Sequence, residues 1–409
     1  MLVRAEPQRD APAAADSRRG GSQSGMRVYN ERLVLSLIRQ HGSLPKAEIA
    51  RLTGLSAQTC SVIVKGLEAD GLLRKEKPQR GRVGQPSVPF SLNPEGSHSI
   101  GLKIGRRSAD VVLMNLAGTV IARHRQPYRY PEPQGLFEFA EASWLDLESR
   151  LPRPDRTRIS GLGTAMPGEI WNWAQEVGAL PGILDQWRTL DVEQELAARS
   201  PWPVFVQNDA TAACAAELTF GVGEHHRDFL YFFVGSFIGG GLVMDGRLVT
   251  GRSGNAGALG SILVPDGRGG ARQLIQCASI FTLERRIEEA GGDPQMLWND
   301  DDSWNGLGGI VETWIGEAAR NIAVAIVSTM AVIDLETVVI DGSFPSAVRG
   351  RLRTAVNRAV ARLDRQGLGP FQVIDGTIGR DARAVGGATL PLLANFAIHS
   401  ELFLKRPAG

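Results

Sequence analysis

The stretch KAEIARLTGLSAQTCSVIVKGLEADGLL, residues 46–73, has the pattern of a helix-turn-helix. Pro45 suits the first turn of a short helix, and Gly54 suits the turn that follows it. Ser56 is a good N-cap for the second helix. Apolar residues recur on that helix at i, i+3, i+4 and i+7, which predicts one buried stripe of Cys60, Ile63, Val64 and Leu67.

The opposite face of the second helix carries mostly short or polar side chains, as a helix that enters the DNA major groove requires. We expect DNA contacts from Gln58, Thr59, Ser61 and Lys65. Two predicted strands follow, LLRKEK and PSVPFSL, around a basic loop with Arg80 and Arg82. Such a loop can reach the DNA backbone or the minor groove. Residues 26–95 are therefore predicted to form a winged helix-turn-helix that binds double-stranded DNA.

The charge distribution favours this interpretation over the alternative, a winged helix used only for protein contacts. Residues 1–91 contain 15 lysine and arginine residues against 8 aspartate and glutamate residues, a net charge of +7. Because the whole chain has a formal charge of +1, residues 92–409 carry −6. The positive charge is therefore concentrated at the end that would neutralise DNA phosphates.

The composition is that of an ordinary soluble protein with more than one domain. A chain of 409 residues with 43% hydrophobic and 22% charged residues is long enough for two or three domains. Residues 1–25 lack the apolar segment of a secretory signal, and we expect a disordered tail there. No uninterrupted apolar run reaches the roughly 18 residues of a membrane span. We expect a cytoplasmic protein with no membrane partner.

From residue 96 onward the pattern changes to alternating strands and helices. Three strands are predicted over 99–128, followed by a helix, two more strands and the helix ATAACAAELTFG, residues 210–221. The order then begins again at DFLYFFVGSFIGGGLVMDGRLVTG, residues 228–251. This repetition predicts two related α/β lobes with a cleft between them over residues 96–409.

Four motifs of this larger part occur in a characteristic order. They are G-L-G-T-A-M-P-G (161–168), V-Q-N-D-A-T-A-A (206–213), V-G-S-F-I-G-G-G (234–241) and G-R-S-G-N-A-G-A-L-G (251–260). With the helix-turn-helix before them, the chain resembles the repressor branch of the ROK family (repressors, open reading frames and kinases) over about residues 28–400. The resemblance implies an actin-like ATPase or sugar-kinase-like fold with a sugar pocket between two lobes. It also implies a homodimer or homotetramer.

The resemblance also shows where this chain departs from a sugar kinase. Family kinases have a D-x-G-x-T-type turn for phosphate and metal, and here Lys103 replaces the aspartate and Arg107 the threonine. A lysine cannot bind magnesium, and Arg106 and Arg107 are bulky where backbone must approach phosphate. The arginines could bind phosphate themselves, but loss of the phosphate site is the favoured interpretation. We expect no phosphotransfer and no cofactor.

A second departure concerns sugar and metal ligands. Where family kinases have G-E-x-G-H, this chain has Ala258 in place of the sugar-binding glutamate and Ser261 in place of the metal-binding histidine. The family's zinc loop has several cysteines, whereas residues 266–280 contain only Cys277. Because a structural zinc site needs about four ligands, we expect no zinc and no other metal.

Asn208 and Asp209, at the end of a predicted strand, are the main candidates for ligand binding. The matching residues of family kinases bind sugar and act as general base, and an amide beside a carboxylate can hold vicinal hydroxyls. The alternative is that Asp209 only caps the following helix. Trp171 could stack on a sugar ring or belong to the core. The predicted ligand-binding residues are Gly163, Gly168, Glu169, Trp171, Asn208, Asp209 and Gly257.

These observations predict a transcriptional regulator, a repressor, rather than an enzyme. We expect an oligomer that binds a pseudo-palindromic operator and responds to a sugar or sugar derivative in the interlobe cleft. Two alternatives remain open. One is a sugar kinase that has kept a DNA-binding domain, and the other is a regulator controlled by a protein partner.

Overall fold

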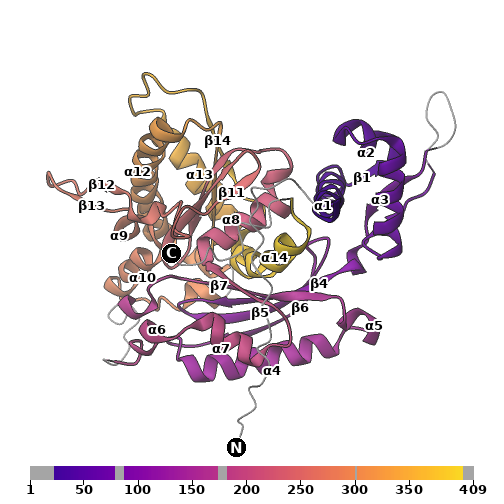
Figure 1. Ribbon diagram of the computed structural model, residues 1–409. Coiled ribbons are helices and arrows are strands. Elements are labelled where there is room, and N and C mark those ends of the chain that lie inside the picture. The colour runs from indigo at the N-terminus through magenta and orange to yellow at the C-terminus, as the bar shows by residue number, and fades with distance from the viewer. Residues whose placement is uncertain (1–22, 79–86, 174–181, 300–301, 399–409) are drawn as a thin grey trace, which may run out of the picture.

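The computed structural model describes residues 23–78, 87–173, 182–299 and 302–398. Figure 1 shows a small domain with α1 (Gln23–His41), α2 (Lys46–Thr53) and α3 (Ala57–Ala69) beside a larger α/β body. Most of the tail expected over 1–25 lies outside the described residues, and α1 begins at Gln23.

The small domain is a winged helix. Its elements are α1 (Gln23–His41), β1 (Ser43–Pro45), α2 (Lys46–Thr53), α3 (Ala57–Ala69), β2 (Leu73–Lys75) and β3 (Pro89–Leu92), with antiparallel strands in the order β1-β3-β2. Gly54 has a φ of 70°, and the Ser56 side chain caps α3 by accepting a hydrogen bond from the Thr59 amide. Pro45 ends β1 and precedes α2, so it is not in the first helical turn as predicted. The predicted stripe of α3 is buried.

Two five-stranded sheets of the same topology form the larger body. The first contains β4 (His98–Ile104), β5 (Ser108–Asn115), β6 (Val120–Pro127), β7 (Ile159–Met166) and β8 (Val204–Asn208), in the order β6-β5-β4-β7-β8. The second contains β9 (Phe229–Val234), β10 (Ile238–Met244), β11 (Arg247–Val249), β14 (Thr337–Gly342) and β15 (Gln372–Asp375), in the order β11-β10-β9-β14-β15. In each sheet the first three strands along the chain form an antiparallel meander, and the other two run parallel to the first strand. This shared topology confirms the predicted pair of related lobes.

Helices cover both faces of each sheet. The first lobe contributes α4 (Pro133–Ser149), α5 (Arg153–Arg156), α6 (Gln186–Thr189), α7 (Val192–Arg199) and α8 (Asp209–Phe220). The second contributes α9 (Ile275–Ala278), α10 (Ile280–Glu289), α11 (Met296–Asn299), α12 (Gly308–Ile333), α13 (Ser346–Val360) and α14 (Ala382–Phe396), with a small hairpin of β12 (Leu263–Pro265) and β13 (Ala271–Gln273). Short 3-10 turns are η1 (Pro94–Gly96), η2 (Ile170–Trp173), η3 (Val222–Glu224), η4 (Leu259–Ser261), η5 (Asp302–Leu307) and η6 (Gly379–Asp381).

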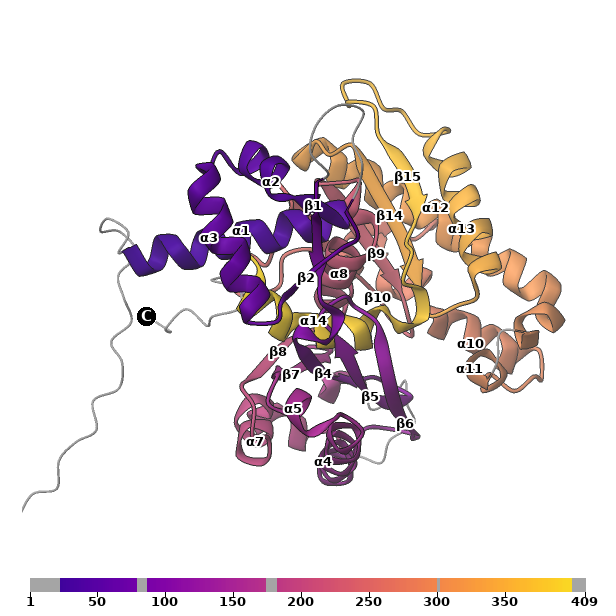
Figure 2. The ribbon, with the colours of Figure 1, turned by 90° about the vertical axis from the view of Figure 1, so that its right-hand side faces the viewer.

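The helices α8 and α14 lie side by side between the two sheets. α8 follows the first sheet in sequence but packs on β9 and β10 of the second, whereas α14 follows the second sheet and packs on β4 and β7 of the first. Small residues allow this close packing, because a Cβ added to Gly386 of α14 would lie 2.2 Å from the Ala212 carbonyl oxygen of α8. Figure 2 shows α14 between the winged helix and the strands of the first lobe.

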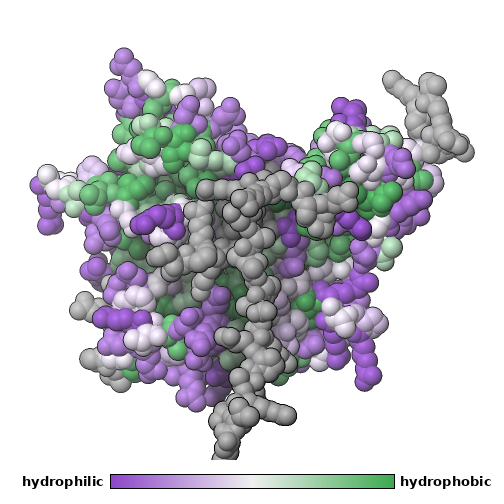
Figure 3. Space-filling view, in the orientation of Figure 1, coloured by the Kyte–Doolittle hydropathy of each residue, from purple (hydrophilic) through white to green (hydrophobic). Residues whose placement is uncertain are grey.

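One helix, with the turn before it (Asp302–Ile333), is long and apolar enough to cross a membrane by length and composition alone. Its buried side chains, among them Trp314, Ile322 and Ile326, belong to the main core of the second lobe. In Figure 3, hydrophobic residues (green) reach the surface near α12 beside hydrophilic ones (purple). The long apolar segment of the sequence is therefore explained by packing of α12 in that core.

Candidate functional site

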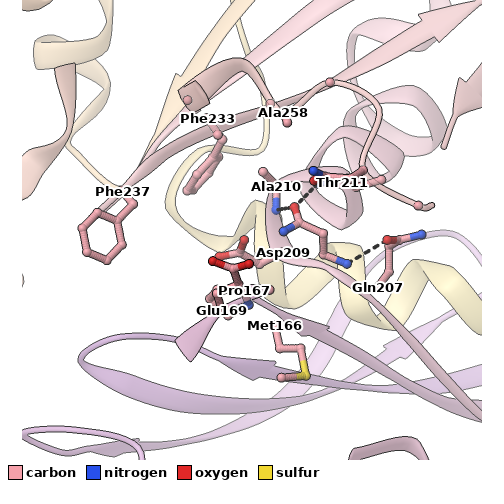
Figure 4. A pocket seen from close by; sticks show the side chains of 18 of the residues that line it. Met166, Pro167, Glu169, Gln207, Asp209, Ala210, Thr211, Phe233, Phe237 and Ala258 are labelled. Carbon is pink, nitrogen blue, oxygen red and sulfur yellow. Dashed lines mark hydrogen bonds between the residues drawn. The ribbon is translucent and has the colours of Figure 1, made fainter. Parts of the chain in front are cut away.

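A cleft of about 1640 Å³ opens between the two lobes. The ends of β7 and β8 and the start of α8 line one side, and β10 with the loop 250–258 lines the other. Figure 4 shows Asp209 and Glu169 beside the cleft, with Phe233 and Phe237 on the side of the second lobe. The wall combines aromatic rings with amides and carboxylates, the mixture typical of a site for a small polar ligand.

Asn208 and Asp209 have different roles at the start of α8. The Asn208 side chain is the N-cap and accepts hydrogen bonds from the amides of Ala210 (3.1 Å) and Thr211 (3.3 Å). Asp209 is the first residue of the helix and does not cap it. Its carboxylate instead accepts a hydrogen bond from the Arg383 guanidinium at 3.0 Å. The alternative that Asp209 is the cap is therefore wrong, because its neighbour occupies that role.

Arg383, which was missed in the sequence, lies in the first turn of α14 and lines the cleft. Its guanidinium also donates to the Ser343 hydroxyl (3.2 Å) and lies over the Phe233 ring, 5.0 Å from the centroid. A cation is unfavourable at the positive end of a helix, so the Asp209 carboxylate compensates for its position. The one indication in the sequence was a charged residue inside an otherwise small and apolar helix.

The other predicted ligand residues divide into two groups. Gly168, Glu169 and Gly257 line the cleft with Asn208 and Asp209. Glu169 is exposed there and accepts a hydrogen bond from the Asn172 amide at 2.6 Å. Gly257 has a φ of 78°, and a Cβ would lie 2.7 Å from the Gly241 Cα, so backbone geometry alone requires glycine.

Two predicted residues lie outside the lining of the main cleft. Gly163 is buried in β7, where a Cβ would lie 1.9 Å from the Gly387 carbonyl oxygen of α14. Close packing of α14 on the sheet therefore explains why residue 163 is a glycine. Trp171 lines an adjacent depression of about 510 Å³ together with the buried Trp187, and it packs against the core of the first lobe.

The turn 103–107, where family kinases have their phosphate and metal residues, contains two largely buried groups of ion pairs. Lys103 donates to Asp110 at 2.5 Å and to the Ser108 hydroxyl at 2.9 Å. Burial lowers the pKa of Lys103 in spite of Asp110. Burial opposes ionisation of Asp110 as well, but Lys103 and Arg125 hold the pKa of that carboxyl below its ordinary value. The lysine thus pairs with a neighbouring strand of its own sheet.

The arginines of the same turn reach across to the second lobe. Arg106 and Arg107 donate to the two oxygens of Glu284 on α10, at 2.8 and 3.0 Å. Trp298 donates its indole N–H to the same carboxylate at 2.8 Å, and the Arg106 guanidinium lies 5.6 Å from the centre of the Phe237 ring. These four polar residues, the Glu284 cluster, join the lobes. Their existing pairing argues against the alternative that the arginines are a free phosphate site.

The segment that takes the place of the family's zinc loop contains β12, β13 and α9. Cys277 is buried, and its Sγ lies 3.4 Å from the Leu274 carbonyl oxygen, which accepts a hydrogen bond. Within residues 23–78, 87–173, 182–299 and 302–398, no three His, Cys, Asp or Glu side chains are grouped as metal ligands. The absence of structural zinc stays a prediction.

The predicted DNA surface lies on α3, on the side of the winged helix away from the two lobes (Figure 1). Gln58, Thr59 and Lys65 are exposed. Ser61 is half-buried, and its hydroxyl accepts a 3.5 Å hydrogen bond from Lys46. Arg80 and Arg82 lie outside the described residues. The structure therefore brings three of the predicted side chains to one open surface.

Both central helices end at the winged helix. α8 ends at Phe220, and the Arg39 guanidinium of α1 lies 5.2 Å from the centre of that ring. Burial lowers the pKa of Arg39 to about 10. α14 ends at Phe396, which packs against the core of the winged helix. The same two helices that meet in the cleft through Asp209 and Arg383 thus support the winged helix at their other ends.

Known proteins resemble this chain in sequence or in fold. Among related sequences, uncharacterized protein y4fQ of Sinorhizobium fredii is 26% identical over 374 residues, or 90% of this chain and 91% of that protein. The xylose repressor of Bacillus spizizenii is 25% identical over 242 residues, or 59% of this chain and 62% of its own length, so this match spans less than two thirds of the repressor. A solved ROK family transcriptional regulator, a homolog of the E. coli MLC protein, has the same fold, with a TM-score of 0.65 at 18% identity over 92% of this chain and 98% of that one.

Two family models cover most of the chain. The MarR family model matches residues 29–82, which contain the helix-turn-helix. The ROK family model matches residues 99–392, which contain both lobes and the cleft. This match extends over more than half of the sequence, and the chain therefore belongs to the ROK family.

Proposed function

We propose that this protein is a DNA-binding transcriptional regulator that responds to a sugar or sugar derivative in the interlobe cleft. The observation that carries the proposal is the pair of helices that join the cleft to the winged helix. A ligand site with no such connection would have no route to DNA, and a DNA-binding domain with no cleft would have no effector.

DNA binding is supported by the chemistry of the winged helix. Gln58 and Lys65 are exposed on α3, and neither side chain forms a hydrogen bond with a described residue. An amide can read a base edge, and an ammonium group can neutralise a phosphate. Two copies of the chain would place two α3 helices in successive major grooves of a pseudo-palindromic operator. Such a regulator would act in the cytoplasm, as a dimer or a tetramer.

A sugar effector is supported by the polar groups of the cleft. The exposed Glu169 carboxylate and the Asp209 carboxylate can both accept hydrogen bonds from hydroxyl groups. The matched relative from Bacillus spizizenii is a xylose repressor, which favours the same class of effector. Ala258 and Ser261 line the cleft where kinases of the family carry larger polar residues, so the contacts to the effector must differ from those to a kinase substrate.

The switch would act through the Asp209–Arg383 ion pair. Hydroxyl groups that bind Oδ2 of the Asp209 carboxylate would compete with the Arg383 guanidinium for that oxygen atom. A change in this ion pair would shift the position of α8 relative to α14. Because these helices end at Phe220 and Phe396, the winged helix would shift with them. The ligand controls DNA binding only if it prefers one of the two arrangements.

Loss of kinase activity is part of the proposal. In a kinase of this family the matching aspartate takes a proton from the sugar hydroxyl, but here Arg383 holds one oxygen of Asp209. The turn that would hold phosphate and metal carries Lys103 and two arginines that pair with Asp110 and Glu284. Neither arrangement favours phosphoryl transfer, which depends on a bound metal and open phosphate contacts.

Selection of duplexes from a random-sequence DNA library by the full chain tests the DNA-binding half. We expect an enriched inverted repeat whose half-sites lie about 10 base pairs, or a multiple of that, apart. A panel of sugars is first ranked by how far each raises the melting temperature of the protein. Each sugar is then added to a mixture of the protein and the enriched duplex. One sugar should change the affinity for DNA.

Two variants and one enzymatic assay complete this test. Asp209→Asn should abolish the response to sugar, whereas Asp381→Asn should keep it, because Asp381 has an exposed ion pair with Arg123 outside the cleft. No enrichment of any DNA sequence would contradict the regulator. Sugar-dependent ATP consumption that Asp209→Asn removes would instead favour the kinase. A response only to a protein partner would contradict the sugar effector.

A further inference from the structure

A large apolar side chain is exposed in the middle of the predicted DNA surface. Val62 of α3 is 64% exposed, although its neighbours Ile63 and Val64 are buried. Burial within the chain does not explain a valine at this position, and β-branched residues do not favour helices. Val62 lies one helical turn from Gln58 and about one turn from Lys65. These three side chains form one stripe on the exposed face.

The stripe is open because, within the part of the chain that the structure describes, its polar side chains form no hydrogen bond or ion pair and Val62 is largely exposed. Other side chains of the same face bond internally: the Thr59 hydroxyl lies 2.9 Å from that of Ser56, and the Ser61 hydroxyl accepts from Lys46. The side chains of Gln58 and Lys65 form no hydrogen bond with any described residue. An amide, an apolar side chain and a cation therefore point away from the protein in sequence along α3.

We propose that Val62 selects thymine at one position of each DNA half-site, through contact with the thymine C5 methyl group. That methyl is the apolar feature of the major groove, which otherwise presents hydrogen-bond donors and acceptors. Val62 and Gln58 are separated by about 6 Å along the helix axis, or one to two base-pair steps. The thymine is thus one or two base pairs from the base that Gln58 contacts. The proposal rests on the proposed DNA-binding function.

Replacement of thymine by deoxyuridine tests this contact, because uracil lacks only the methyl group. The duplex enriched by the full chain is synthesised with each thymine replaced in turn, and affinity is measured by fluorescence anisotropy. Loss of one methyl contact should weaken binding about fourfold for one half-site and about fifteenfold for both. Val62→Ala should weaken binding to the unmodified duplex to a similar extent, and the sensitive thymine should then tolerate replacement.

The matched control is Val28→Ala, the same substitution at a 45% exposed valine of α1. It should leave the pattern of sensitive thymines unchanged. The inference is overturned if no thymine is sensitive, or if Val62→Ala keeps the sensitivity of the original protein. Either result would contradict only the Val62 contact, because an enriched sequence would still support the proposed DNA-binding function. Failure to enrich any sequence would overturn both the inference and the proposed function.

Discussion

Glu284→Gln should destabilise the protein more than any exposed charge change, because it leaves two guanidinium groups without their anion. Glu284 is 3% exposed, and its partners Arg106 and Arg107 are 5% and 18% exposed. The variant keeps the size of the side chain and can still accept a hydrogen bond. What it removes is the negative charge between two cations at 2.8 and 3.0 Å.

The expected loss follows from the burial of the Glu284 cluster. Removal of one partner from a buried ion pair costs about 3–5 kcal/mol, since the remaining charge is left uncompensated. The three groups are too buried for solvent to screen that charge well. We expect urea unfolding, followed by tryptophan fluorescence, to show a free energy of unfolding lower by this amount. Replacement of both arginines and Glu284 by apolar residues of similar size should cost much less.

Glu317→Gln is the control for this measurement. Glu317 of α12 pairs with Arg286 of α10, the helix that also carries Glu284, but both side chains of this pair are about one-third exposed. An exposed pair of this kind contributes roughly 0–1 kcal/mol. If Glu284→Gln is no more destabilising than Glu317→Gln, the Glu284 cluster does not hold the two lobes together.

Three further predictions test other parts of the structure. Lys65→Ala should reduce the slope of log DNA affinity against log salt concentration by about one unit, because one phosphate contact is lost. An unchanged slope would show that Lys65 does not contact phosphate. Gly163→Ala should lower the free energy of unfolding by about 1–3 kcal/mol because its Cβ would lie 1.9 Å from the Gly387 oxygen, whereas Gly168→Ala, with open space around it, should not. Burial and the nearby Glu217 raise the pKa of Asp341 from 3.8 to about 6, so the folded protein binds more protons than the unfolded chain between these values and stability falls as pH rises through them. Thermal unfolding at pH 4–7 should therefore depend less on pH in Asp341→Asn, and equal pH dependence in both proteins would refute the assignment.

The fold could be predicted because its determinants are local. The i, i+3, i+4, i+7 stripe of α3 and the Ser56 cap lie within one short segment, and both are present in the structure. The two passes of strands and helices likewise indicated the two lobes before any contact between them was known. The periodicity of apolar residues indicates which side of a helix or strand is buried, and that is sufficient to predict the fold class.

The candidate site could be predicted only in part, since its main interactions join distant residues. Asn208 and Asp209 are both good helix caps, and propensity cannot choose between neighbours. The choice depends on Arg383, 174 residues further along the chain, which pairs with Asp209. The contacts of Arg106 and Arg107 with Glu284 span 178 and 177 residues. Local sequence patterns cannot identify ion pairs between residues that lie so far apart in the chain.

The motif glycines show a related ambiguity. Gly163 and Gly168 belong to the same motif, yet one packs against α14 and the other lines the cleft. A glycine in a sequence indicates that space or backbone geometry is restricted, but it does not say whether a ligand or a helix fills the space.

The affinity of the effector sugar, measured by calorimetry with and without the enriched operator duplex, tests the central claim most directly. Two coupled sites must influence each other by the same factor, because the coupling free energy is shared. If the sugar changes DNA affinity through the cleft, the duplex should change the Kd of the sugar by an equal factor, and Asp209→Asn should remove both effects. A sugar Kd that is the same with and without the duplex would show that the cleft and the winged helix are not coupled.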